Sequence, residues 1–183
     1  MDRKTLKLLL QNYRTPFEEE AVFIDDFVAL TEDEMAFKRE RLAGHFTASS
    51  WIVNKKRTHT LLTLHAKLNR WLQLGGHADG HENLLEVAMK EAREESGLIS
   101  LRLVDANIFD IDKHLIPERN EVPQHLHYDV RFLIEAEIDE PLSMSKESND
   151  LAWVPFDIVQ DITFSNMSMM RMLEKTSKSE FVF

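Results

Sequence analysis

One stretch of the chain limits the possible fold more than any other. Residues 75–98 read GGHADGHENLLEVAMKEAREESGL, a charged helix between two glycine turns. Residues three and four apart share a face of a helix, and one face begins with Leu84, Val87 and Ala88. Two helical turns later the same face carries Glu91, Glu94 and Glu95, which we call the carboxylate stripe. We therefore expect the first half to pack on a sheet and the second half to serve another purpose.

The sequence also predicts where this helix begins and ends. Asn83, with Glu86 three residues later, is a capping pattern, and Gly97 supplies the left-handed conformation at which many helices end. Lys90 and Arg93 occupy positions suited to solvent, as does Glu86. These features predict an amphipathic helix between Asn83 and Gly97.

Three carboxylates within about one helical turn repel one another, which raises their pKa values unless a cation lies among them. A hard divalent cation bound through oxygen supplies that charge, and the chain has no cysteine to bind a softer metal. Mg²⁺ or Mn²⁺ is therefore the expected ion. The alternative is a glutamate-rich face exposed to solvent, and the carboxylate stripe alone leaves both interpretations open.

The residues around the stripe resemble the signature of the Nudix hydrolases. That signature is a glycine, five residues, a glutamate, seven residues, and then Arg-Glu-apolar-any-Glu-Glu-any-Gly-apolar. Here Gly76 and Glu82 have this spacing, and residues 90–98 read KEAREESGL. The clear departure is Lys90 in place of the arginine.

The resemblance implies roles for the residues of this box. The implied metal ligands, which also carry catalysis, are the carboxylates of Glu91, Glu94 and Glu95, with the carbonyl of Gly76 as a further ligand. Glu91 is the candidate general base, although the family places its base variously. Glu82 usually pairs with the arginine of the motif, a role that Lys90 fills here while pointing away from the carboxylates. Glu82, Lys90 and Gly97 are thus the implied structural residues.

The same resemblance implies an α/β fold, a Nudix-type α/β/α sandwich with a mixed β-sheet. We expect a Nudix domain over residues 44–183 after a helical extension over residues 1–43. Segments rich in β-branched and aromatic residues predict strands at 46–54, 58–65, 71–74, 101–111, 125–138 and 151–155. Amphipathic segments predict helices at 155–162 and 165–176.

The extension is expected to contain two capped helices. Thr15 precedes Pro16 at one start, and Thr31 with Glu34 forms a capping box at the other, with Gly44 as a stop. We interpret the extension as a scaffold or a homodimer contact, with a substrate lid as the alternative.

A second polar set lies outside the box. Along one predicted strand, alternate positions hold His125, His127, Asp129 and Arg131. One interpretation is a solvated sheet face. The other is a polar wall for substrate phosphate or a second metal position, with Arg131 suited to a two-pronged phosphate contact. His65 and Lys67, which precede the box, are further candidates for substrate phosphate, and Glu147 in a late loop is a candidate for the metal site.

The resemblance implies a metal-dependent hydrolase that cleaves the diphosphate linkage of a small nucleoside diphosphate derivative, such as a nucleotide sugar or ADP-ribose. Bound cations neutralise such a bridge and orient the attacking water. One alternative is a non-catalytic module that senses nucleotides. The other is isopentenyl diphosphate isomerase, which shares the fold but uses a cysteine that this chain lacks.

Composition narrows the partners. A formal net charge of -10 argues against binding to DNA, and it disfavours RNA, because such binding depends on clustered Lys and Arg. No apolar run approaches the length that crosses a bilayer, and no signal peptide is evident, so neither a membrane nor secretion is expected. The absence of cysteine agrees with a cytoplasmic location.

Overall fold

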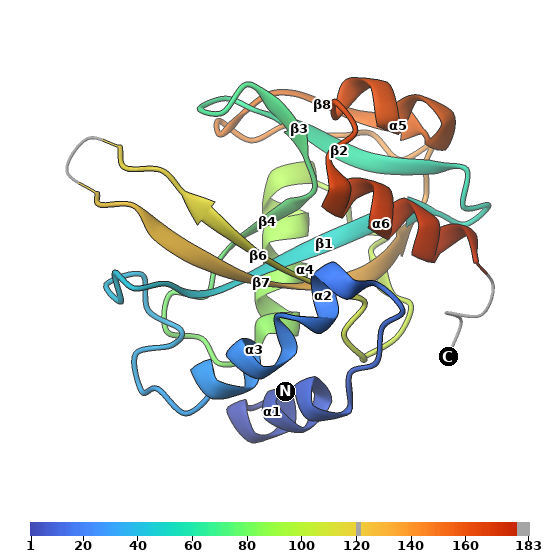
Figure 1. Cartoon of the computed structure of the whole chain (residues 1–183). Coiled ribbons are helices and arrows are strands. Elements are labelled where there is room, and N and C mark those ends of the chain that lie inside the picture. Colours follow the sequence, from blue (N-terminus) through green and yellow to red (C-terminus); the bar gives the residue numbers. More distant parts are fainter. Residues whose placement is uncertain (120–121, 179–183) are drawn as a thin grey trace. The chain divides into compact units, whose positions relative to one another are not determined.

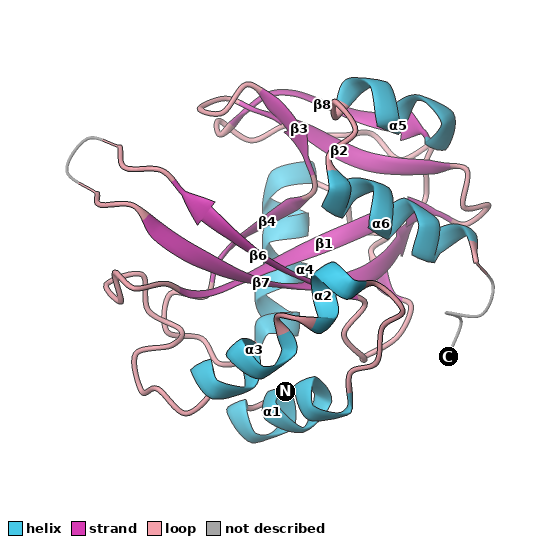
Figure 2. Cartoon of the chain, in the orientation of Figure 1, coloured by secondary structure: helices cyan, strands magenta, loops and turns pink. Residues whose placement is uncertain are grey.

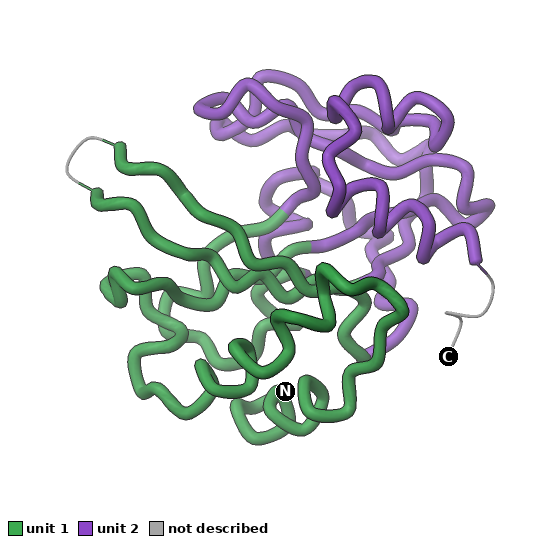
Figure 3. Tube along the Cα trace, in the orientation of Figure 1, with its two compact units in different colours: residues 1–49, 75–88, 107–132 green, residues 50–74, 89–106, 133–183 purple. Residues whose placement is uncertain are grey.

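A computed structural model describes residues 1–119 and 122–178 of the chain. By contacts, the chain divides into two compact units (Figure 3). Unit 1 contains Met1–Ser49, Gly75–Ala88 and Asn107–Phe132. Unit 2 contains Ser50–Leu74, Met89–Ala106 and Leu133–Phe183. The predicted domain boundary between residues 43 and 44 stays a prediction, since unit 1 combines the extension with later segments.

Along the described part of the chain, helices come first, then strands, a single helix, further strands and finally helices (Figures 1 and 2). The helices are α1 (Arg3–Asn12), α2 (Glu18–Ala21), α3 (Ile24–Leu30), α4 (Leu84–Ser96), α5 (Phe156–Ile162) and α6 (Met167–Ser177). The strands are β1 (His45–Asn54), β2 (His59–His65), β3 (Arg70–Leu72), β4 (Leu74–His77), β5 (Arg102–Leu103), β6 (Asp110–Ile116), β7 (His125–Ala136) and β8 (Ser148–Pro155). Among the described residues, each helix is too short or too polar to cross a bilayer.

The strands form a sheet with the order β3-β2-β1-β7-β5, in which β4 pairs with β1, β6 with β7 and β8 with β2. The pairs β1–β2, β2–β3, β2–β8, β5–β7 and β6–β7 are antiparallel. The predicted α/β class is confirmed, and so are the strands that match β1, β2, β7 and β8. The single strand predicted over residues 101–111 is wrong at its centre, because β5 and β6 are separate strands there.

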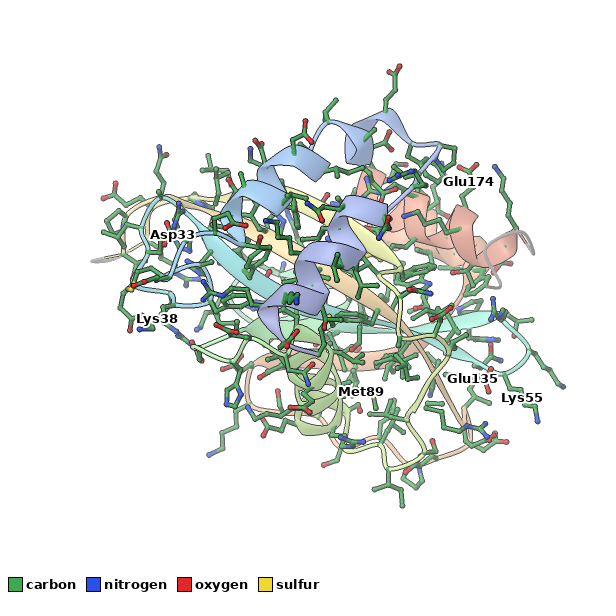
Figure 4. The ribbon with its side chains drawn as sticks, turned by 90° about the horizontal axis from the view of Figure 1, so that it is seen from below. Asp33, Lys38, Lys55, Met89, Glu135 and Glu174 are labelled. Atoms are coloured by element: carbon green, nitrogen blue, oxygen red, sulfur yellow. The ribbon has the colours of Figure 1, made fainter. Side chains whose placement is uncertain are left out.

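The core of unit 2 explains why α4 carries small and aliphatic residues. Ala92 of α4 is fully buried in a cluster with Ile52, Leu61 and Ile134, and Met89 packs against that cluster. Met89 is labelled on α4 in Figure 4. Burial of this apolar surface stabilises the packing of α4, whose apolar face lies against the core while its polar face is exposed to solvent.

Helix α6 is held to β1 within unit 2. The Trp51 side chain is fully buried, and its Nε1 donates a hydrogen bond of 2.8 Å to Thr176 Oγ1 on α6. Met169 and Met172 on the same helix are buried. The methionine-rich segment is therefore an amphipathic helix, as its sequence predicts.

Two helix starts in the extension were predicted wrongly. Thr15 does not begin a helix, since α2 starts at Glu18 and Thr15 Oγ1 instead bonds to the Glu20 carboxylate. Residues 31–44 form turns, because Thr31 Oγ1 donates back to Val28 O (2.6 Å). Hydroxyl groups that bond to nearby chain atoms compete in this way with helix capping.

Glu20 fixes the extension within unit 1. This fully buried carboxylate accepts hydrogen bonds from the Tyr13 hydroxyl (2.6 Å), the Thr15 hydroxyl and the backbone N–H of Ile111 on β6 (3.1 Å). Replacing Glu20 with alanine leaves these donors without their carboxylate partner.

We expect Glu20→Ala to lower the free energy of unfolding by about 2–3 kcal/mol, because each buried polar group left unsatisfied costs about 1–3 kcal/mol. Chemical denaturation measures the effect. The matched control is Glu18→Ala on the same helix, where the side chain is exposed and a change within about 0.5 kcal/mol is expected. Equal losses in both variants would contradict this role for Glu20.

Candidate functional site

Helix α4 begins and ends as its sequence predicts. Asn83 Oδ1 accepts a hydrogen bond from the Glu86 backbone N–H (3.3 Å) at the start. At the end, Gly97 has a φ of 73°, and its N–H donates to Arg93 O (2.8 Å). A Cβ at Gly97 would lie 2.6 Å from the Ser143 Cβ, so both conformation and space require glycine.

The carboxylate stripe lies in unit 2, on the second half of α4. The Glu91 side chain is 21% exposed and that of Glu94 is 59% exposed, so the stripe runs from a half-buried carboxylate to an open one. Lys90 Nζ lies 3.3 Å from Glu91 Oε1 and 3.3 Å from Glu94 Oε2. The expectation that Lys90 points away from the carboxylates is therefore wrong, because the flexible lysine folds back to the nearest negative charges.

The surroundings of Glu91 shift the pKa of its carboxyl group. Burial raises the pKa of Glu91, and the charges of Glu94 and Glu147 raise it further, while Lys90 acts in the opposite direction. Burial is thus the main cause of the raised pKa, and Lys90 offsets more of the rise than either neighbouring carboxylate adds. This is the electrostatic setting in which an added cation is stabilising.

Glu147 comes to this region on the turn that precedes β8. In unit 2, Glu147 O accepts a hydrogen bond from the Ala66 N–H (2.9 Å), which joins this turn to the one after β2. His65 ends β2 and Lys67 lies in the turn after it, where His65 Nδ1 accepts from the Lys67 N–H (3.2 Å). The structure therefore brings the predicted residues His65 and Lys67 to the loop of Glu147, and the Lys67 side chain is exposed there.

The first part of the box lies in unit 1. A Cβ at Gly75 would lie 2.4 Å from Ser49 Oγ, so only glycine allows β4 to come this close to β1. Gly76 follows in β4, and its role as a metal ligand stays a prediction. Glu82 pairs with Arg3 of α1 at 2.8 Å. The predicted pairing of Glu82 with Lys90 is therefore wrong, because the cation comes from the extension and Lys90 pairs with Glu91 and Glu94.

Asp129 and Arg131 are buried rather than exposed to substrate. Arg131 is 2% exposed, and its Nε, Nη1 and Nη2 face Asp129 (2.7 Å), Asp110 (3.1 Å) and Asp112 (3.3 Å). Asp129 also accepts from the hydroxyls of Thr47 and Ser49, each at 2.9 Å. We call Asp110, Asp112, Asp129 and Arg131 the aspartate–arginine cluster.

The aspartate–arginine cluster corrects the interpretation of Asp129 and Arg131 as substrate-binding residues. Each side of the Arg131 guanidinium already faces a carboxylate, so the fork needed to grip a phosphate is engaged. We assign both residues to the stabilisation of the sheet. Period-two alternation predicted that they share a face but not that β6 supplies two further aspartates.

His125 and His127 lie elsewhere, in a group that the sequence predicted only in part. They gather in unit 1 with His45 and His77, and one ring nitrogen of each lies within 4.8 Å of the others. Burial lowers the pKa of His77 to about 4 and that of His127 to about 2, so both rings are neutral near pH 7. The sequence did not predict that His45 and His77 belong to this group. Each of them directly follows a glycine at a strand end.

Comparison with known proteins gave the following matches. The family model described as the NUDIX domain matches residues 44–173. A comparison with curated protein sequences gave no match.

Solved structures resemble the chain at low sequence identity. A hydrolase of the NUDIX family from Clostridium perfringens is 24% identical, with a TM-score of 0.57, over 72% of this chain and 95% of that one. An Ap4A hydrolase from C. elegans, solved as a binary complex, is 17% identical, with a TM-score of 0.52, over 72% and 94%. A bifunctional NMN adenylyltransferase/ADP ribose pyrophosphatase from Francisella tularensis, complexed with AMP and Mn, is 15% identical, with a TM-score of 0.52, over 84% and 49%.

Proposed function

The chain belongs to the Nudix family, and from that premise we propose that it hydrolyses the diphosphate linkage of a small nucleoside diphosphate derivative with the help of Mg²⁺ or Mn²⁺. The predicted α/β fold with a mixed sheet is that of the Nudix hydrolases. The observation that carries the proposal is the carboxylate stripe, in which the half-buried Glu91 feels the negative charges of Glu94 and Glu147 and has Lys90 as a partial counter-charge.

The donor set fits a hard divalent cation. Glu91, Glu94 and Glu95 offer oxygen ligands from one helix face, which suits Mg²⁺ or Mn²⁺ better than a softer metal. When bound there, the ion neutralises diphosphate charge and lowers the pKa of water. Lys90 partly neutralises the stripe in this structure, at 3.3 Å from two of its carboxylates.

Residues of unit 2 supply the other groups that the reaction needs: a general base, negative charge near the cation and a contact for substrate phosphate. Glu91 is the candidate base, because a carboxylate with a raised pKa takes a proton from water more readily than an ordinary one. Glu147 adds negative charge near Glu91 and strengthens the demand for a cation. Lys67 is exposed on the turn joined to the Glu147 loop, where its ammonium suits a substrate phosphate. His65 shapes this turn by accepting the Lys67 N–H.

Two of the similar structures support a small nucleotide as the substrate. One is an Ap4A hydrolase, and the other contains an ADP ribose pyrophosphatase and is complexed with AMP and Mn. For this chain we propose the shared chemistry, a nucleoside linked through a diphosphate, with a nucleotide sugar or an ADP-ribose-like molecule as the representative substrate. The formal net charge of -10 agrees with a small ligand rather than with a nucleic acid.

A substrate panel tests the proposal. The full chain is incubated with Mg²⁺ or Mn²⁺ and with ADP-ribose, nucleotide sugars, dinucleoside polyphosphates, coenzyme A, NADH and nucleoside triphosphates, and the release of nucleoside monophosphate or pyrophosphate is followed. We expect turnover of at least one nucleoside diphosphate derivative, which EDTA abolishes. Tight binding of one compound without any turnover would overturn the proposal in favour of a nucleotide sensor.

A further inference from the structure

We propose that His45, His77, His125 and His127 form a second metal site, one that takes a transition metal of the Zn²⁺ class and is separate from the carboxylate stripe. We call these four residues the histidine cluster. They come from the start of β1, the end of β4 and the start of β7. All four lie in unit 1, whereas the carboxylate stripe lies in unit 2. The proposal is independent of the proposed hydrolysis.

The distances in the histidine cluster match the demands of a tetrahedral metal. Zn²⁺ binds imidazole nitrogen at about 2.0–2.1 Å, so two ligands of a tetrahedral site lie about 3.3 Å apart. His125 Nε2 and His127 Nε2 are 3.2 Å apart. All four ligand atoms lie within 4.8 Å of one another, so the widest separation has to shorten to about 3.3 Å when the ion binds.

Two of the rings are held by a hydrogen bond from Nδ1 to a backbone carbonyl, as metal-binding histidines usually are. His45 Nδ1 lies 3.3 Å from Arg41 O, and His125 Nδ1 lies 2.9 Å from Pro123 O. Because a carbonyl oxygen only accepts, each Nδ1 carries the proton and donates it. In the neutral ring, the Nε2 then carries the lone pair, which is the form that binds a metal.

His45 supplies the strongest sign of a missing ligand. Its side chain is 1% exposed, and within the described part of the chain its Nε2 has no hydrogen-bond partner. A buried polar atom without a partner costs free energy, so such atoms are rare in native proteins. The ring centroids of the other three histidines lie 5.1–5.3 Å from that of His45. A bound cation would satisfy it.

The chemistry of the histidine cluster favours a metal over a phosphate. A tight phosphate site needs several N–H donors directed at one point, whereas His45 and His125 already donate their Nδ1 protons to backbone carbonyls. Four imidazoles, with no carboxylate among them, suit Zn²⁺ and similar ions rather than Mg²⁺. Bound metal would tie β1, β4 and β7 together at one point of unit 1.

Titration of the purified full chain with Zn²⁺ alone tests the proposal, with calorimetry for stoichiometry and Co²⁺ absorption as a signature of tetrahedral coordination. We expect one Zn²⁺ per chain and a tetrahedral Co²⁺ spectrum. His125→Gln and His127→Gln, chosen because both residues are only half-buried, are each expected to weaken Zn²⁺ binding by at least about 10-fold. Circular dichroism checks that these variants fold.

Two controls assign the binding to the histidine cluster. His81→Gln changes an exposed histidine of unit 1 outside the cluster, and Glu94→Gln/Glu95→Gln changes the carboxylate stripe. Both are expected to leave the Zn²⁺ affinity within about twofold of the wild type. The proposal is overturned if folded His125→Gln and His127→Gln bind Zn²⁺ as tightly as the wild type. It is equally overturned if the wild type binds no Zn²⁺. Neither outcome decides whether the chain is a hydrolase, because the substrate panel tests that proposal separately.

Discussion

Glu94→Gln and Glu95→Gln are each expected to lower kcat/KM on the best substrate of the panel by about 10²–10³-fold, which corresponds to about 3–4 kcal/mol of transition-state stabilisation. Glutamine keeps the shape of the side chain but removes the charge that binds the cation. Glu94 is 59% exposed and pairs with exposed Lys90, so its loss should not disturb the fold. Steady-state kinetics at saturating Mg²⁺ measures the effect.

Glu86→Gln is the matched control for these variants. Glu86 lies on the same helix and is exposed, but it lies outside the carboxylate stripe. We expect its kcat/KM to stay within about twofold of the wild type. If Glu94→Gln and Glu95→Gln behave like Glu86→Gln, the assignment of the metal ligands is wrong.

The largest effect on stability is expected at Arg131. Replacing it with methionine, which has a similar length, leaves Asp110, Asp112 and Asp129 without the cation that they share. Removing one partner of a buried ion pair typically costs about 3–5 kcal/mol, and we expect Arg131→Met to lower the free energy of unfolding by that amount near pH 7. Urea denaturation followed by circular dichroism measures it.

Arg102→Met provides the control for Arg131→Met. Arg102 also pairs with two carboxylates, those of Glu135 and Glu137, but its side chain is 57% exposed. Glu135 is labelled in Figure 4. Exposed ion pairs contribute about 0–1 kcal/mol, so a small loss is expected here. Equal losses in the two variants would show that the aspartate–arginine cluster is no more important for stability than a surface pair.

Local signals made the central helix predictable. Asn83 and Gly97 act through the backbone of their own turn, so the ends of α4 follow from neighbouring residues alone. The same holds for β7, where apolar residues alternate along the strand. The carboxylate stripe depends on helical spacing, and its residues therefore share the predicted face.

Other features depend on partners distant in the sequence. Arg131 looked available for phosphate until β6 supplied Asp110 and Asp112 beside it. Lys90 has several conformations open to it, and sequence spacing does not select the one directed at Glu91 and Glu94. The histidine cluster combines residues up to 82 positions apart, His45 to His127, which no local pattern connects.

Mn²⁺ binding followed by electron paramagnetic resonance tests the central claim most directly, because the signal of free Mn²⁺ falls when the ion is bound. His127→Gln is introduced into every protein, so that the histidine cluster contributes little. We predict that this parent protein binds Mn²⁺ and so lowers the signal of the free ion. Adding Glu91→Gln, Glu94→Gln and Glu95→Gln to it is expected to restore that signal. Mn²⁺ bound as tightly without the three carboxylates as with them would contradict the claim that the carboxylate stripe holds the catalytic cation.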